Sequence, residues 1–158
     1  MRGFTGAKGA TGLSGANGGP GPQGNPGPTT DVLPSGKTER GWFLADTNAA
    51  KSELLGTSIT FNFALPSAPA VSYVDIKGPA TAACPGSLAS PQAAPGKLCL
   101  YLGLRLNVDT TGSYVFGIDA ISSNEEDSTA DPFGAQIYGR ALAEGRAEYH
   151  GTYAVTAP

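Results

Sequence analysis

The sequence is poor in the features that mark membrane proteins and nucleic-acid-binding proteins. Its 158 residues contain no apolar run of about eighteen, the length that a membrane-spanning helix requires. The 10 Lys and Arg residues are outnumbered by 13 Asp and Glu residues, and every acidic residue lies after residue 29. An acidic C-terminal part does not suit phosphate backbones, so no nucleic-acid partner is expected. No secretory leader is visible at the N-terminus.

Serines are plentiful, but histidine and cysteine, the residues that most often serve as catalytic bases, thiol nucleophiles or zinc ligands, are scarce. The chain has one histidine, His150, and two cysteines, Cys84 and Cys99. A serine or cysteine nucleophile needs a base beside it, and no Gly-X-Ser-X-Gly turn occurs. Two cysteines without nearby histidines supply only half of a zinc site. We therefore expect no catalytic residue, no metal and no cofactor, and we expect His150 on the surface or in an interface.

Glycine, in contrast, is abundant and strictly spaced at the N-terminus. It recurs at every third position without a miss: Gly3, Gly6, Gly9, Gly12, Gly15, Gly18, Gly21, Gly24 and Gly27. This is the collagen register, in which three polyproline-II-like chains wind together and only glycine fits at the axis. A flexible Gly-rich linker would not keep this phase. The pattern predicts a triple-helical stalk over residues 1–29 and, because its hydrogen bonds run between chains, a homotrimer.

Proline divides the stalk into two parts. All four stalk prolines, Pro20, Pro22, Pro26 and Pro28, lie in the triplets nearest the rest of the chain. Proline pre-sets the polyproline-II φ angle and lowers the entropy lost on winding. We therefore expect the C-terminal head to trimerise first and to set the register of the stalk. Met1 and Arg2 fit the last two positions of a triplet, so we expect more stalk, and an export signal, upstream.

Residues 30–36 interrupt the triplets as a linker, and residues 37–158 read as an all-β head. Strands are expected at 37–46, 58–65, 71–77, 97–108, 113–119, 132–143 and 146–156. The longest alternating run places Leu98, Leu104 and Val108 on one face, and residues 109–112 form a turn that makes 113–119 its hairpin partner. A short helical turn is expected within 49–55. Seven to eight short strands separated by Gly and Pro predict a two-sheet β-sandwich.

The two cysteines flank a loop that is too rich in Pro and Ala to make a core of its own. By alternation, Cys99 points to the face opposite Leu98 and Leu100, where it can meet the loop that carries Cys84. We expect an intrachain Cys84–Cys99 disulfide, which closes a loop of about 15 residues. Two unpaired thiols are the alternative, because cysteine usage alone does not prove an oxidising compartment.

Three further groups of residues are weaker candidates for sites. Acidic residues cluster at Glu125, Glu126, Asp127 and Asp131. Oxygen-rich loops hold calcium, but this spacing is not an EF-hand, and a solvated loop is the preferred interpretation. Four aromatic residues are candidates for a sugar-binding platform, or for core and interface positions: Trp42, Tyr73, Tyr101 and Tyr138. Glu144 and Glu148 are the carboxylate pair that a glycoside-cleaving sandwich would need.

The Gly-X-Y segment, together with LPSGKTERG, CPGSLASPQAAPGKLC and GTYAVTAP, resembles collagen-like proteins of bacteria, of the actinobacterial type, with a C-terminal globular β head. The resemblance implies an extracellular or cell-surface location and no established activity. By analogy, the head is similar to the jelly-roll heads of the C1q and tumour-necrosis-factor group.

The favoured function is that of a non-enzymatic structural and interaction protein, whose head mediates adhesion or binds a glycan or protein ligand. One alternative is a phage tail fibre or other virion protein with a receptor-binding head. A carbohydrate-active enzyme is a third and weaker alternative.

Overall fold

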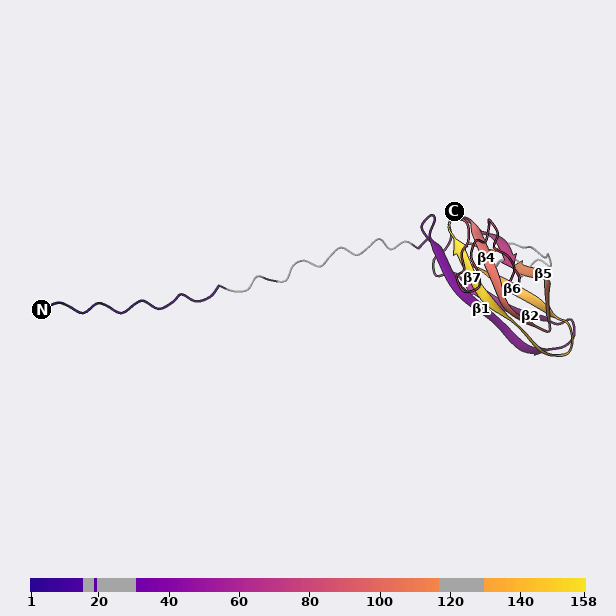
Figure 1. The fold of residues 1–158 in the computed structure, drawn as a ribbon, viewed down its shortest axis with the longest axis horizontal. Coiled ribbons are helices and arrows are strands. Elements are labelled where there is room, and N and C mark those ends of the chain that lie inside the picture. Colours follow the sequence, from indigo (N-terminus) through magenta and orange to yellow (C-terminus); the bar gives the residue numbers. More distant parts are fainter. Residues whose placement is uncertain (16–18, 20–30, 117–129) are drawn as a thin grey trace.

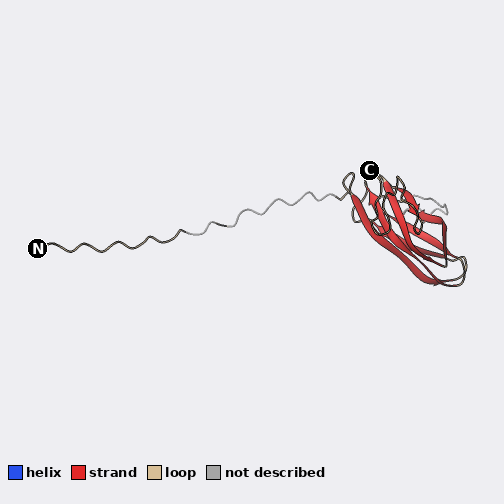
Figure 2. Cartoon of the chain, viewed as in Figure 1, coloured by secondary structure: helices blue, strands red, loops and turns tan. Residues whose placement is uncertain are grey.

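The computed structural model describes residues 1–15, 19, 31–116 and 130–158, and for residues 110–116 the backbone alone. Residues 1–15 form an extended chain without secondary structure (Figures 1 and 2). The described residues from 31 onward form a head built of strands, with no helix among them. The strands are β1 (Thr38–Ala49), β2 (Leu54–Thr60), β3 (Ala70–Val74), β4 (Lys97–Leu106), β5 (Val108–Phe116), β6 (Gly134–Ala141) and β7 (Gly145–Thr156).

The seven strands form two sheets. The larger has the order β1-β7-β4-β3, and the smaller has the order β2-β6-β5 (Figure 1). All neighbours are antiparallel except β3 and β4, which are parallel. Two sheets that enclose one apolar core make a β-sandwich, which agrees with the all-β, two-sheet head expected for residues 37–158.

The core fills the space between the two sheets. Because successive side chains on a strand point to opposite faces, each strand contributes alternate residues to it. Phe43, Leu100 and Tyr149 reach inward from the four-stranded sheet, and Ile59 and Ile137 reach inward from the three-stranded sheet. Strand β7 lies between β1 and β4 and is therefore buried along most of its inner face.

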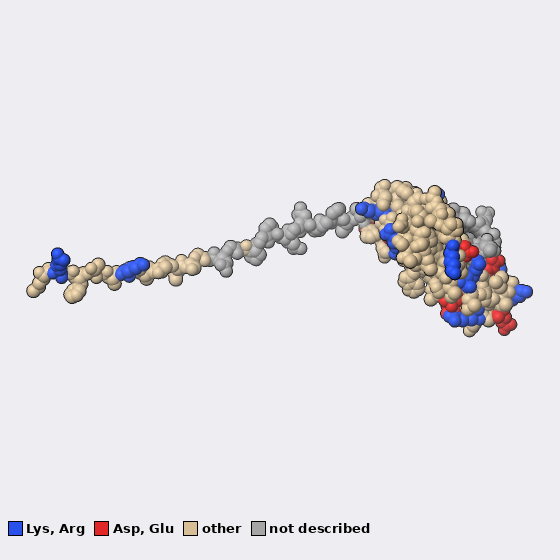
Figure 3. All heavy atoms as spheres, viewed as in Figure 1, with Lys and Arg blue, Asp and Glu red and all other residues tan. Residues whose placement is uncertain are grey.

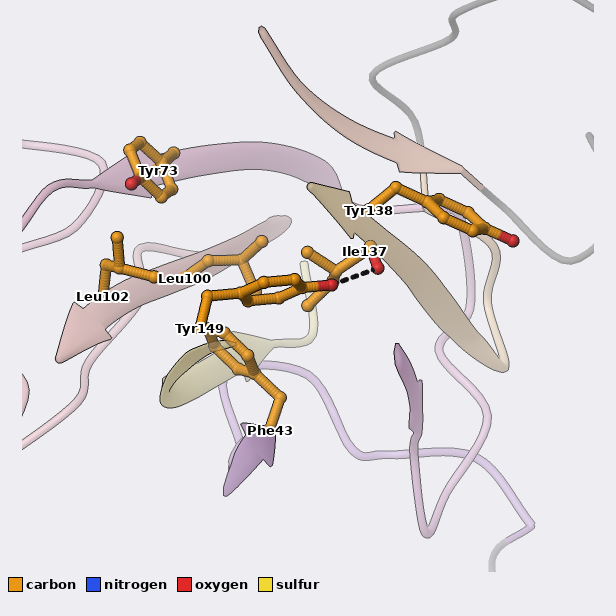
Figure 4. A pocket seen from close by; sticks show the side chains of 7 residues that line it. All are labelled: Phe43, Tyr73, Leu100, Leu102, Ile137, Tyr138 and Tyr149. Atoms are coloured by element: carbon orange, nitrogen blue, oxygen red, sulfur yellow. Dashed lines mark hydrogen bonds between the residues drawn. The ribbon is translucent and has the colours of Figure 1, made fainter. Parts of the chain in front are cut away.

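Tyr149 crosses the core and links the two sheets. From β7 its hydroxyl donates a hydrogen bond of 2.6 Å to the carbonyl oxygen of Ile137 on β6 (Figure 4). The carbonyl of Leu55 on β2 lies 3.3 Å from the same hydroxyl oxygen. The ring is 1% exposed, and burial raises the pKa of the Tyr149 phenol. This side chain thus combines a large apolar surface with a satisfied polar group.

The long alternating run at 97–108 departs from the expectation in its second half. Leu98, Leu100 and Leu102 point into the core as expected, but the pairing of β4 with β7 shifts register between Leu102 and Leu104. An extra residue in one strand of a pair turns the side chains that follow to the other face. Leu104 and Leu106 therefore lie on the outer face of the sheet, whereas an uninterrupted alternation would put Leu104 on the same face as Leu98.

The expected hairpin of 97–108 with 113–119 is wrong. Residues 109–112 lie within β5, which pairs with β6 in the other sheet, and residues 117–119 lie outside the described residues. The chain passes between the sheets at Asn107, whose φ of 53° is a left-handed conformation that asparagine tolerates. The Asn107 side chain exchanges hydrogen bonds with Ala143 in the β6–β7 turn, at 2.9 and 3.0 Å. Asn107 thus directs β4 and β5 into different sheets.

The segment before β1 is part of the head. Leu33 is buried in the core, and its N–H donates to the carbonyl of Ala64 at 2.8 Å. The buried carboxylate of Glu39 accepts hydrogen bonds from the N–H groups of Asn62 (2.9 Å) and Phe63 (2.8 Å). These contacts replace sheet pairing, so β2 ends at Thr60.

Two smaller expectations also change. Phe63, in the segment 58–65 expected as a strand, lies beyond the end of β2 and is exposed. Residues 50–53 form a non-helical turn between β1 and β2, where a short helical turn was expected.

The sheet-to-sheet contact of Tyr149 predicts a specific loss of stability. Tyr149→Phe removes the hydroxyl and should lower the free energy of unfolding by about 1–2 kcal/mol, the range expected for a buried hydrogen bond to a carbonyl that is then less well satisfied. The Tyr138 hydroxyl donates to Gln136 on its own strand and is less buried, so Tyr138→Phe is the control. Urea titration should show a change within about 0.5 kcal/mol for the control. Equal losses in the two variants would contradict the assigned link.

The raised pKa of Tyr149 predicts a dependence of stability on alkaline pH. In the unfolded chain the phenol titrates at about pH 10, and in the folded protein it titrates higher. The stabilisation is complete below the unfolded value and is lost as the pH rises above it. Urea midpoints measured between pH 8 and pH 11 should fall less for Tyr149→Phe than for the unmodified protein, and parallel curves would refute the assignment.

Candidate interaction surface on the four-stranded sheet

A disulfide joins Cys84 to Cys99, as the sequence predicted. The two sulfur atoms lie 2.05 Å apart, and the described residues include no free cysteine. Both cysteines are fully buried in a small second cluster with Val74 and Tyr101, outside the main core. Cys99 therefore does point away from Leu98 and Leu100, to the outer face of the four-stranded sheet.

The loop closed by this disulfide covers one half of that outer face. The backbone carbonyls of the loop accept hydrogen bonds from side chains of the sheet: Thr156 donates to Ala93 at 2.8 Å and Arg40 donates to Pro91 at 2.7 Å. Tyr101 donates to a third loop carbonyl. A loop with few large apolar side chains thus stays in place mainly through the disulfide and through hydrogen bonds to its backbone.

The other half of the outer face is uncovered and carries exposed apolar side chains. We name this half the outer-sheet patch; it consists of Trp42, Leu44, Leu88, Leu104 and Leu106. The strand register makes these residues contiguous across β1, β7 and β4, because His150 pairs with Leu44 on one side and with Leu104 on the other. Trp42 is 72% exposed and is the only tryptophan in the chain.

A row of charged side chains borders the patch. Arg146 contacts both carboxylate oxygens of Asp46 at 3.0 Å and reaches Glu148 at 2.8 Å. Glu148 in turn lies 3.1 Å from Nδ1 of His150. Asp46 and Glu148 face each other across β1 and β7, so the guanidinium between them offsets a like-charge pair. The Arg146 hydrogen bond holds the pKa of the Asp46 carboxyl below its usual value.

Two shallow hollows flank Leu88, the patch residue contributed by the loop. One, of about 440 Å³, lies between Leu88 and Trp42 and has His150 and Thr152 in its wall. The other, of about 380 Å³, lies on the far side of Leu88, next to Gly103. Leu88 packs so closely over Gly103 that an added Cβ there would lie 3.0 Å from its Cδ2 atom. Apolar walls with few polar groups suit a protein partner better than a small polar ligand.

The structure does not assemble the aromatic platform suggested by the sequence. Trp42 is exposed on the larger sheet, whereas Tyr101 is buried beneath the disulfide loop. Tyr138 lies on the other sheet, and Tyr73 lines a narrow gap at the core together with Tyr149 (Figure 4). Trp42 is therefore the one member of the set with a broad exposed surface.

The two carboxylates suggested for a glycoside-cleaving site, Glu144 and Glu148, do not line a common hollow. Glu144 lies in the exposed β6–β7 turn, while Glu148 is held by Arg146 and His150, and the hollow beside Trp42 is lined by Glu148 but not by Glu144. His150 lies on β7 with a partly exposed side chain, as the sequence predicted.

Most of the acidic cluster falls outside the described residues, which exclude Glu125, Glu126 and Asp127. Asp131 is described and pairs through its backbone with Gly134. The described part of the chain contains no group of three or more His, Cys, Asp or Glu side chains placed to hold a metal ion. On the face of the head seen in Figure 3, the acidic side chains gather at the lower right with basic side chains among them, and further basic side chains lie at the upper left.

The described stalk glycines contact nothing within one chain. An added Cβ at Gly3, Gly6, Gly9, Gly12 or Gly15 would meet no atom within 4 Å. Gly18, Gly21, Gly24 and Gly27 lie outside the described residues. Among the described residues, no helix is both long and apolar enough to span a membrane. Comparison with models of protein families, with curated proteins and with solved structures finds no significant match.

The disulfide predicts a defined product of proteolysis. Trypsin cleaves after Lys77, Lys97 and Arg105, so an unreduced digest should contain peptides 78–97 and 98–105 joined through Cys84 and Cys99. Reduction should separate them, and mass spectrometry measures both states. Two free thiols in protein from an oxidising compartment would contradict the assignment.

Loss of the disulfide should also destabilise the head. The bond closes a loop with a sequence separation of 15, and replacing both cysteines by serine should cost about 3 kcal/mol in the chain-entropy account. Urea titration of the doubly substituted protein checks the value. The matched control is Ser90→Ala, because the Ser90 side chain is exposed on the same loop.

Proposed function

We propose that this protein is a non-enzymatic, collagen-like homotrimer, in which a triple-helical stalk carries β-sandwich heads that mediate adhesion or ligand binding. The observation that carries the proposal is the unbroken Gly-X-Y register from Gly3 to residue 29. The backbone hydrogen bonds of a collagen helix form between chains, so this repeat can build the helix only together with two further chains.

The strand order supports a jelly-roll type of head. The first and last strands of the head pair with each other, and the sheet orders β1-β7-β4 and β2-β6-β5 interleave strands from both ends of the sequence. Such long-range antiparallel pairing is typical of Greek-key and jelly-roll sandwiches. The parallel edge strand β3 is a departure from that plan.

The disulfide supports a location outside the cytoplasm, at the cell surface or in the surrounding medium. Disulfides persist in oxidising compartments and are rare where thiols are kept reduced. A buried disulfide that secures a loop otherwise short of apolar contacts is a structural bond of this kind.

The mass of the protein in solution tests the proposed trimer. Sedimentation equilibrium of the full chain should give three times the 15.9 kDa of one chain. Circular dichroism should add a polyproline-II component to the β signal. A monomeric full chain at micromolar concentration would refute the proposed function.

A substitution at one stalk glycine tests the triple helix separately. Gly12→Val places a side chain at the crowded axis and should lower the melting temperature of the polyproline-II signal while the β signal of the head is unchanged. Thr11→Val, at the neighbouring triplet position, introduces the same residue away from the axis and is the control. Equal effects of the two substitutions would show that the glycine register has no structural meaning.

A further inference from the structure

We propose that the outer-sheet patch is the contact between heads, and that three copies of it converge on the threefold axis of the trimer. The inference rests on the proposed function, since it assigns a surface to a trimer that the Gly-X-Y repeat requires. It commits to a second and third copy of this chain as the occupants of the patch.

The chemistry of the patch favours a protein contact. Large exposed apolar residues lie on contiguous rows of one sheet face, and their rim is polar through Asp46, Arg146 and Glu148. An apolar centre with a polar border is the usual composition of a protein interface, and tryptophan is enriched among the residues that dominate binding energy. The rim charges already pair within one chain, so bringing copies together leaves no carboxylate of this row without a cation nearby.

The position of the patch in the chain favours further copies of the same chain as its partner. Three chains that wind in one stalk leave it side by side. Strand β1 begins at Thr38, soon after the stalk, and Trp42 lies four residues later, at a distance of about 13 Å along an extended strand. The disulfide loop covers the start of β1 on this face, where Arg40 bonds to Pro91, so Trp42 is the first exposed residue of the patch that neighbouring copies can reach.

The position of β1 at the edge of the sheet is a second reason to expect that another copy of the chain covers this surface. Among the described strands, β1 pairs with β7 alone, so its other side is a free edge of 12 residues. A long exposed edge promotes unwanted pairing with other chains unless it carries charged residues or is covered. Packing of the patch around a threefold axis would bring β1 of each head against a neighbour and would shield this edge.

The single tryptophan makes the patch directly observable in the full-length protein. In the trimer, Trp42 should be shielded from acrylamide, with blue-shifted emission, and dilution below the association range should expose it. If the chain is trimeric but Trp42 is quenched as readily as in denatured protein, the patch is not the interface, although the proposed trimer stands. In that case the patch is free for a glycan or another protein. If the chain is monomeric at all concentrations, both proposals fail.

A pair of matched substitutions tests the contact without altering the reporter. Leu44→Glu puts a charge in the patch and should raise the concentration at which half the chains are trimeric at least about tenfold. Leu54→Glu makes the same change at a similarly exposed leucine of β2, in the other sheet, and should leave assembly unchanged.

The β signal in circular dichroism and the unreduced peptide pair confirm folding of each variant. Leu104→Glu, on β4, replaces Leu44→Glu if the latter does not fold. Undiminished trimer formation by a folded patch variant would overturn the inference.

Discussion

The pairing of the first strand of the head with its last is the contact on which the remaining structure depends. Twelve residue pairs, from Thr38 opposite Thr156 to Ala49 opposite Gly145, join β1 to β7. Because β7 also pairs with β4, it forms the middle of the larger sheet and orients the inner residue Tyr149 toward the smaller sheet. The same register places His150 between Leu44 and Leu104 on the outer face. The pairing of β1, β7 and β4 thus puts the core residues on one face of the sheet and the candidate surface on the other.

The sequence could predict that strands form here, but it could not predict which strands pair. Alternation with period two identifies a half-buried strand from local information, which is why the segment containing β4 was found. Pairing joins residues that are far apart, and no local pattern specifies it. Two local signals were present in the β4 segment: Gly103 at the register shift and Asn107 at the left-handed turn. Glycine and asparagine inside an apolar alternating run are typical of bulges and bends.

The candidate surface was missed because of the same register shift. In an unbroken alternation, Leu104 and Leu106 belong with Leu98 in the core, so the sequence shows no excess of apolar residues outside. The disulfide was predictable, because alternation turns Cys99 away from the core and the loop has little else to hold it. Its consequence was not predictable: the loop covers one half of the outer face and adds Leu88 to the edge of the uncovered half.

In the proposed trimer, the balance between stalk and head follows from entropy. Winding three chains fixes the backbone of every stalk residue, at a cost of about 1–2 kcal/mol per residue, and the outer five triplets have no proline to reduce it. Nine triplets offer few interchain hydrogen bonds against this cost. Association of the heads changes the problem, because it holds the three chain ends together and makes winding an intramolecular step at high effective concentration. Leu33, buried in the core just before β1, fixes the point at which each chain leaves the head. A contact between heads that begins at Trp42 on β1 would therefore hold the three chains in common register where winding begins.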